Sequence, residues 1–128
     1  MRIFRNAWFE RFARRQQITD AALLDALVRA ERGQIDADLG GGVLKQRVAR
    51  AGQGKSGGYR TIILHRTAER AIFVYGFAKS DRANLSAQET AQFRKLATHV
   101  LTLSDAQLEA LVRQGLFSEV KEDAQEIS

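Results

Sequence analysis

Lysine and arginine side chains gather in the middle third of this 128-residue sequence. Residues 43–82 contain nine Lys or Arg and two acidic residues, a net charge of +7 against +5 for the whole chain. Clustered charge of one sign builds a steering field, so this stretch predicts a polyanionic partner. Tyr59 lies within it, and cations interleaved with an aromatic ring suit a single strand of nucleic acid. The alternative is a set of solvated charges along strand edges.

A glycine-rich stretch within this region, GQGKSGG at residues 52–58, comes close to a phosphate-binding loop. In that motif a helix must follow the loop, so that backbone amides and the helix dipole converge on the phosphates. Here a run rich in β-branched residues follows, which predicts a hairpin between two strands instead. The chain also has no cysteine and only two histidines, and we expect neither a metal site nor a cofactor.

Three runs in the basic region have the composition and period of β-strands. They span residues 43–50, 59–66 and 70–78. The connections between them are short, which predicts an antiparallel meander in sequence order. The third run is apolar on both faces, as expected of a central strand that is covered on two sides.

The strand pattern predicts that several cations converge. Lys45 and Arg47 share one face of the first strand, because alternate side chains point the same way. Arg60 lies at the start of the second strand, and Lys79 and Arg82 follow the third. If the three strands pair in sequence order, these side chains meet on one face of the sheet.

Helical patterns flank the strands on both sides. Asn6 and either Thr19 or Asp20 are predicted to cap two N-terminal helices, the second ending near Gly33. Two further helices are predicted after the capping boxes SAQE (86–89) and SDAQ (104–107). MRIFR is expected to be an edge strand, DLGGG a turn and LFSEV a last short strand. The predicted class is α+β: N-terminal helices packed on a small antiparallel β-sheet, with additional C-terminal helices.

The segment LGGGVLKQRVARAGQGKSGGYRTIILHRTAERAIFVYGFAKSDRANLS resembles the RelE/HigB-type toxins of toxin–antitoxin pairs, within the RelE/ParE superfamily. The likeness rests on the GKSGG-aromatic-Arg loop before the second strand and on YGFAKSDRANL at the end of the third. In element order it covers residues 1–103. It implies a RelE/HigB-like toxin domain over residues 1–103, to which residues 104–128 add a helical extension with an acidic tail.

This resemblance implies a cytoplasmic mRNA interferase, a ribosome-dependent endoribonuclease that needs no metal because RNA supplies its own 2′-hydroxyl nucleophile. It implies mRNA and the ribosome as partners, no membrane, and a cognate antitoxin, expected to be a helix-turn-helix protein encoded next door. The residues that match the family's catalytic group are Lys45, Arg47, Arg60 and Lys79. The predicted RNA-binding residues are Arg50, Lys55, Tyr59 and Arg82.

The sequence departs from the family pattern after the third strand. Several relatives carry a tyrosine or histidine there, used in proton transfer or stacking, whereas SDRANLSAQETAQ contains neither. The resemblance therefore does not assign the general acid or base. Two other functions stay open at this point: a gyrase-inhibiting ParE-like toxin of the same fold, and a non-catalytic RNA-binding module.

Overall fold

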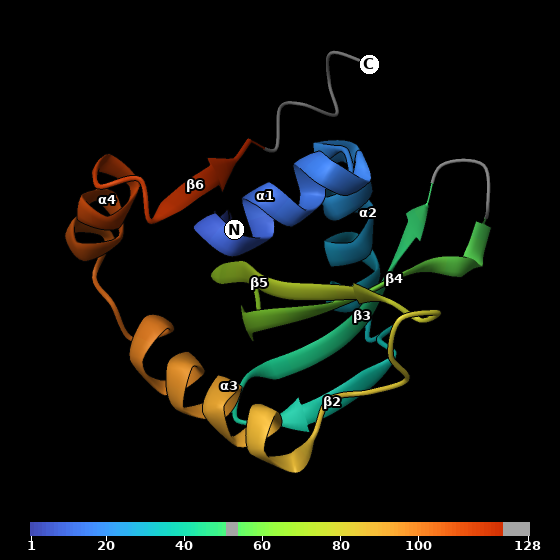
Figure 1. Ribbon diagram of the computed structural model, residues 1–128. Coiled ribbons are helices and arrows are strands. Elements are labelled where there is room, and N and C mark those ends of the chain that lie inside the picture. Colours follow the sequence, from blue (N-terminus) through green and yellow to red (C-terminus); the bar gives the residue numbers. More distant parts are fainter. Residues whose placement is uncertain (51–53, 122–128) are drawn as a thin grey trace.

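The computed structural model describes residues 1–50 and 54–121, with side chains placed except at residues 50 and 54–57. Within this part of the chain, six strands form one sheet in the order β2-β3-β4-β5-β1-β6. Figure 1 shows the neighbouring strands β2, β3, β4 and β5. The strands are β1 Arg2–Asn6, β2 Ala37–Gly40, β3 Val43–Arg50, β4 Gly54–Arg66, β5 Arg70–Ala78 and β6 Phe117–Val120. The helices are α1 Ala7–Gln16, α2 Asp20–Glu31, α3 Ala87–Val100 and α4 Asp105–Arg113.

The predicted fold class is wrong about the sheet and the start of the chain. The described sheet has six strands and is mixed, because β1 runs parallel to β5 while the other neighbouring pairs are antiparallel. The chain begins with the expected strand, but β1 lies between β5 and β6 rather than at an edge, and helices cover both faces of the sheet. Ile3 and Phe4 are both buried, as a strand that is covered on two faces requires.

The DLGGG segment, which was predicted to be only a turn, also supplies residues to the strand β2. Ala37–Gly40 pairs with β3, and the hairpin between the two strands contains three glycines with positive φ, Gly40, Gly41 and Gly42. Residues with a Cβ atom rarely adopt this conformation. The predicted meander of β3, β4 and β5 is confirmed, as is the last short strand, β6. Because β2 extends the sheet beyond the meander, it brings residues 36–40 alongside β3.

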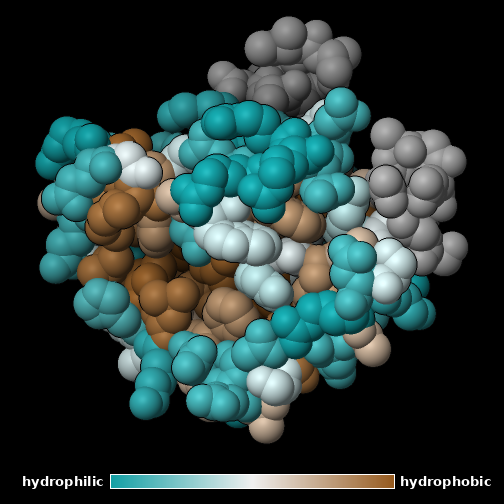
Figure 2. Space-filling model, viewed as in Figure 1, coloured by the Kyte–Doolittle hydropathy of each residue, from teal (hydrophilic) through white to brown (hydrophobic). Residues whose placement is uncertain are grey.

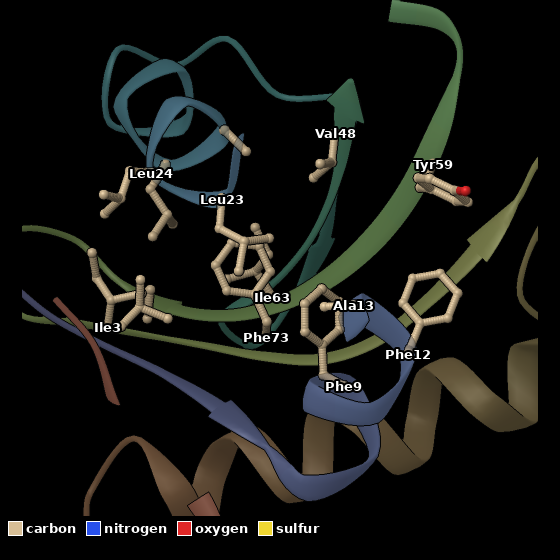
Figure 3. Close-up of a cluster of buried hydrophobic side chains, with 14 residues drawn as sticks. Ile3, Phe9, Phe12, Ala13, Leu23, Leu24, Val48, Tyr59, Ile63 and Phe73 are labelled. Carbon is tan, nitrogen blue, oxygen red and sulfur yellow. The ribbon is translucent and has the colours of Figure 1, made fainter. Parts of the chain in front are cut away.

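Helices cover both faces of the sheet. On one face α1 and α2 pack over a core that includes Phe9, Ile63 and Phe73 (Figure 3). On the other face α3 and α4 pack over Ile62 and Ile72, and Figure 2 shows hydrophobic residues gathered between these two helices. Neighbouring residues in β4 and β5 therefore point into different cores, because side chains alternate along a strand. This explains why these strands are apolar on both faces.

The helices begin where the sequence predicted. Asn6, Thr19, Ser86 and Ser104 are N-caps whose side chains accept backbone N–H bonds, and the last two form complete capping boxes. Asn6 also donates from Nδ2 to the carbonyl of Val74 at 3.1 Å. At this point the β4–β5 register shifts, and such a bulge bends its strand. The start of α1 is thereby tied to the bent part of β5.

Close packing of α1 on β5 makes Gly76 sensitive to substitution. A Cβ at this position would lie 2.6 Å from Cε2 of Phe12. That ring is held by Trp8 stacked beside it and by Tyr59 edge-on. We expect Gly76→Ala to lower the free energy of unfolding by about 1–3 kcal/mol through overpacking, as measured by urea denaturation. In a Phe12→Leu background the same change should cost less, and equal costs in both backgrounds would contradict this account.

Candidate active site

The pairing of β3 with β4 places three of the predicted cations on one face of the sheet. Arg47 is directly opposite Arg60, and Lys45 is opposite Ile62. Residues paired across antiparallel strands point to the same side. The three side chains therefore lie on the face of Ile62, which is the face that α3 and α4 cover.

A carboxylate that the sequence analysis did not consider joins these cations. Asp36 Oδ2 lies 3.4 Å from both Lys45 Nζ and Arg60 Nε, and Asp36 Oδ1 lies 3.4 Å from Arg47 Nε. These four side chains are called the Asp36 cluster below; three positive charges and one negative give it a net charge of +2. Arg60 is 7% exposed, Lys45 14% and Asp36 16%, whereas Arg47 is 46% exposed. The cluster thus reaches solvent mainly through Arg47.

Arg60 keeps a donor available in this arrangement. Its Nη1 atom is buried and has no hydrogen-bond partner among the described residues. Buried polar atoms nearly always have a partner, so an exception needs an explanation. A guanidinium offers five N–H donors in a fork that matches phosphate oxygens. Within the described residues Arg60 thus has one donor left over, and a phosphate oxygen is the kind of acceptor that this donor binds.

The position of Asp36 is fixed by the backbone of β3 and by one buried amide. The Asp36 amide donates to the Lys45 carbonyl at 3.1 Å. Gln46, which is 1% exposed, donates from Nε2 to the carbonyls of Ala26 and Gln34 and accepts from the Arg47 amide at 3.1 Å. Gln46 thereby links three parts of the chain: α2, β3 and the segment that precedes β2. A polar residue at an inward-facing strand position was the available sequence signal for this support.

Arg82 belongs to the turn after β5 rather than to the cluster itself. Its guanidinium donates to both Glu89 oxygens, at 3.0 and 2.6 Å, and to the Asn84 carbonyl, at 3.1 and 2.8 Å. Its link to the cluster runs through Asn84, whose Oδ1 accepts from Lys45 Nζ at 3.3 Å. Arg82 therefore holds the 80–86 segment in place next to Lys45.

The structure says less about three other predicted residues, Lys79, Arg50 and Lys55. Lys79 is exposed and directly follows β5. No ion pair of Lys79 occurs within residues 1–50 and 54–121. Arg50 and Lys55 lie on β3 and β4, but their side chains are outside the described part of the molecule. The strand register alone places both near the β3–β4 hairpin, where Arg50 pairs with Gly54.

Tyr59 is not brought to the basic face, contrary to our expectation. It is 2% exposed and packs in the core under α1, where its ring meets Phe12 edge-on at 5.5 Å (Figure 3). Its hydroxyl donates to Gln16 Oε1 at 2.8 Å. Tyr59 directly precedes Arg60, so alternation along β4 sends the two side chains to opposite faces. Applying the same alternation to the sequence would have separated them.

Two kinds of feature are absent from the described residues. No group of three or more His, Cys, Asp or Glu side chains is arranged to hold a metal ion. No helix in the same part of the chain is both long and apolar enough to cross a membrane.

Comparison with protein families gives one match. The model of the family described as "RelE toxin of RelE / RelB toxin-antitoxin system" matches residues 1–120. No individual curated protein matches the chain. The family match ends with β6, so it includes the strand and helix that follow residue 103.

The Arg82–Glu89 pair predicts a pH dependence of folding stability. The hydrogen bonds from Arg82, with that from the Ser86 backbone, lower the pKa of Glu89 from its ordinary 4.5 to about 2. Between these values the unfolded chain binds more protons, so stability falls as the pH is lowered. We expect Glu89→Gln to remove this part of the decline in urea-denaturation midpoints measured between pH 4.5 and 2. A variant curve parallel to that of the wild type across this range would contradict the assignment.

Proposed function

Because the chain belongs to the RelE toxin family, and so has a cognate antitoxin as its partner, we propose that it is a ribosome-dependent mRNA endonuclease. The observation that supports this activity is the Asp36 cluster, in which three cations from two paired strands meet and Arg60 Nη1 has no hydrogen-bond partner among the residues that the structure describes. A phosphodiester in a single-stranded RNA is an anion of suitable charge for such a group. Unpaired RNA is also the form that an mRNA takes while it is being read.

The chemistry of RNA cleavage fits the residue types in the cluster. RNA carries its own nucleophile, the 2′-hydroxyl, so the protein has to align it, take its proton, stabilise the phosphorane and protonate the leaving oxygen. Arginine stays charged in proteins and cannot act as a base, but it holds phosphate oxygens bidentately. We assign stabilisation of the phosphorane to Arg47 and Arg60. We assign one of the two proton transfers, from the 2′-hydroxyl or to the leaving oxygen, to a lysine, either Lys45 or Lys79.

The charge of the cluster suits this role. The phosphodiester carries one negative charge, and the phosphorane carries two. Cationic donors fixed at the place where charge develops stabilise the transition state more than the ground state, because they need no reorganisation. Arg60 is held in the sheet by its strand and Lys45 by Asn84 and Asp36. The antitoxin would then silence the protein by covering these cations or by blocking the ribosome.

Substitution of the two arginines tests the activity. Arg47→Ala and Arg60→Ala are each expected to lower the rate of mRNA cleavage about 10²- to 10³-fold, the usual effect of losing one such donor. Cleavage is measured by primer extension in a translation reaction with purified ribosomes, and toxicity by growth after induction. Circular dichroism checks that each variant is folded.

Arg66→Ala is the matched control, because Arg66 lies at the other end of β4 and pairs with Glu69 on the surface. It should cleave at the wild-type rate. If both cluster variants cleave like the wild type while folded, the site is wrong. Induction of a DNA-damage response without mRNA cleavage would indicate a gyrase inhibitor instead.

A further inference from the structure

The carboxylate at the centre of the cluster offers a proton acceptor that the basic residues lack. We propose that Asp36 is the general base that removes the proton from the 2′-hydroxyl, an inference that rests on the nuclease function proposed above. Asp36 lies outside the basic stretch of the sequence, and no motif marks it. Its place in the site comes from the pairing of β2 with β3.

The first argument is position. Each of the three cations of the cluster, including the two arginines that we assign to the phosphate, contacts an Asp36 oxygen at 3.4 Å. A phosphate that binds these donors must therefore lie beside the carboxylate. In RNA the 2′-oxygen is on the ribose carbon next to the one that carries the 3′-phosphate. The attacking 2′-hydroxyl is thus brought close to the Asp36 carboxylate, which contacts the same cations as the phosphate.

The second argument is protonation. A charged lysine has no lone pair with which to accept a proton, and arginine stays charged, whereas a charged carboxylate has two acceptor oxygens. Within the Asp36 cluster, only Asp36 can therefore receive a proton. Lys45, bound to Asp36 and Asn84, acts as a positive charge rather than as a base.

The third argument is the charge balance of the reaction. Asp36 takes the proton of the 2′-hydroxyl while the bond from O2′ to phosphorus forms, and the phosphate goes from one negative charge to two. At the same moment the net charge of the Asp36 cluster rises from +2 to +3. The three cations lose their internal partner when the phosphorane needs them most, which is stabilisation specific to the transition state.

The remaining steps close the balance. The bond from phosphorus to the leaving 5′-oxygen breaks, and that oxygen takes a proton from the Lys79 ammonium. The products are a 2′,3′-cyclic phosphate and a 5′-hydroxyl. Asp36 returns its proton to water, and Lys79 regains one from water. We assign this proton to Lys79, which is exposed directly after β5 and forms no ion pair with Asp36 among the described residues.

The surface beside Asp36 has room for a nucleotide. A cavity of about 520 Å³ is lined by Asp36 and Arg47 together with Arg29, Gln34, Ile35 and Gln46. Ligand sites in proteins commonly have volumes of about 300–1,000 Å³. Asp36 and Arg47 thus belong both to the cluster and to the cavity wall. A ribose next to the scissile phosphate can enter from this side and reach the carboxylate.

The test is single-turnover cleavage of ribosome-bound mRNA by Asp36→Asn, which keeps the shape of the side chain and removes its charge. We expect a loss of about 10²- to 10⁴-fold in the cleavage rate, the usual contribution of a general base. Ribosome binding should be unchanged. Without its base the variant should depend on hydroxide from solution, so its rate should rise in direct proportion to hydroxide concentration, whereas the wild-type rate should not.

A substrate with sulfur in place of the leaving 5′-oxygen separates the base from the acid. Sulfur leaves without being protonated, so this substrate should restore cleavage by Lys79→Ala and not by Asp36→Asn. Asp38→Asn is the matched control: Asp38 lies two residues along on exposed β2, where its Oδ1 accepts from the Gly40 amide. It removes the same charge and should cleave like the wild type.

Several outcomes would overturn the proposal. These are cleavage by Asp36→Asn at the wild-type rate, recovery of that variant on the sulfur substrate, or a loss that lies in binding and not in the cleavage rate. If Asp36→Asn does not fold, Asp36→Glu takes its place, with an intermediate rate and the wild-type pH profile expected; a hydroxide-dependent rate would count against the base. A wild-type protein that cleaves no mRNA would refute the proposed function itself, which is a separate result.

Discussion

The burial of Arg60 within the sheet is the constraint on which the site depends. β4 is an inner strand, and this guanidinium is only 7% exposed. Arginine cannot lose its charge in a protein, and a buried charge without a partner costs several kcal/mol. A counter-ion must therefore be carried to it by another part of the chain. Asp36 meets this need because β2 pairs along β3 and Gln46 fixes the segment that precedes β2.

A buried ion cluster is a poor means of stabilising a fold. Replacing such a group by well-packed apolar residues is often neutral or stabilising. The Asp36 cluster interrupts a face of the sheet that otherwise carries apolar residues, among them Ile62, Leu64 and Val74. Folding stability therefore does not account for the cluster, whereas the proposed chemistry on an anion would give it a role. The buried Gln46 supports the cluster with three hydrogen bonds, two donated by Nε2 and one accepted by Oε1.

The C-terminal segment is fastened to the sheet at the end away from the cluster. Arg70, at the start of β5, donates to the carbonyl of Val100 at the end of α3 and to that of Leu103 in the link between α3 and α4. Arg2 of β1 bonds Glu109 of α4 and Glu119 of β6, and this lowers the pKa of Glu119. These bonds join α4 and β6 to the first strand of the chain. Strand β6 thus belongs to the sheet that carries the Asp36 cluster, and α4 is bonded to the same sheet.

The sequence by itself determined what depends on near neighbours: the helix caps, the meander and the shared face of Lys45 and Arg47, because capping and strand alternation act over a few residues. It also contained the signal that separates Tyr59 from Arg60. The tertiary structure alone decided the insertion of β1 between β5 and β6, the pairing of β2 and the arrival of Asp36 at the cations. Each of these joins segments that are separated along the chain, and such contacts form only where burial and charge pairing in the whole fold outweigh the entropy of closing the loops between them.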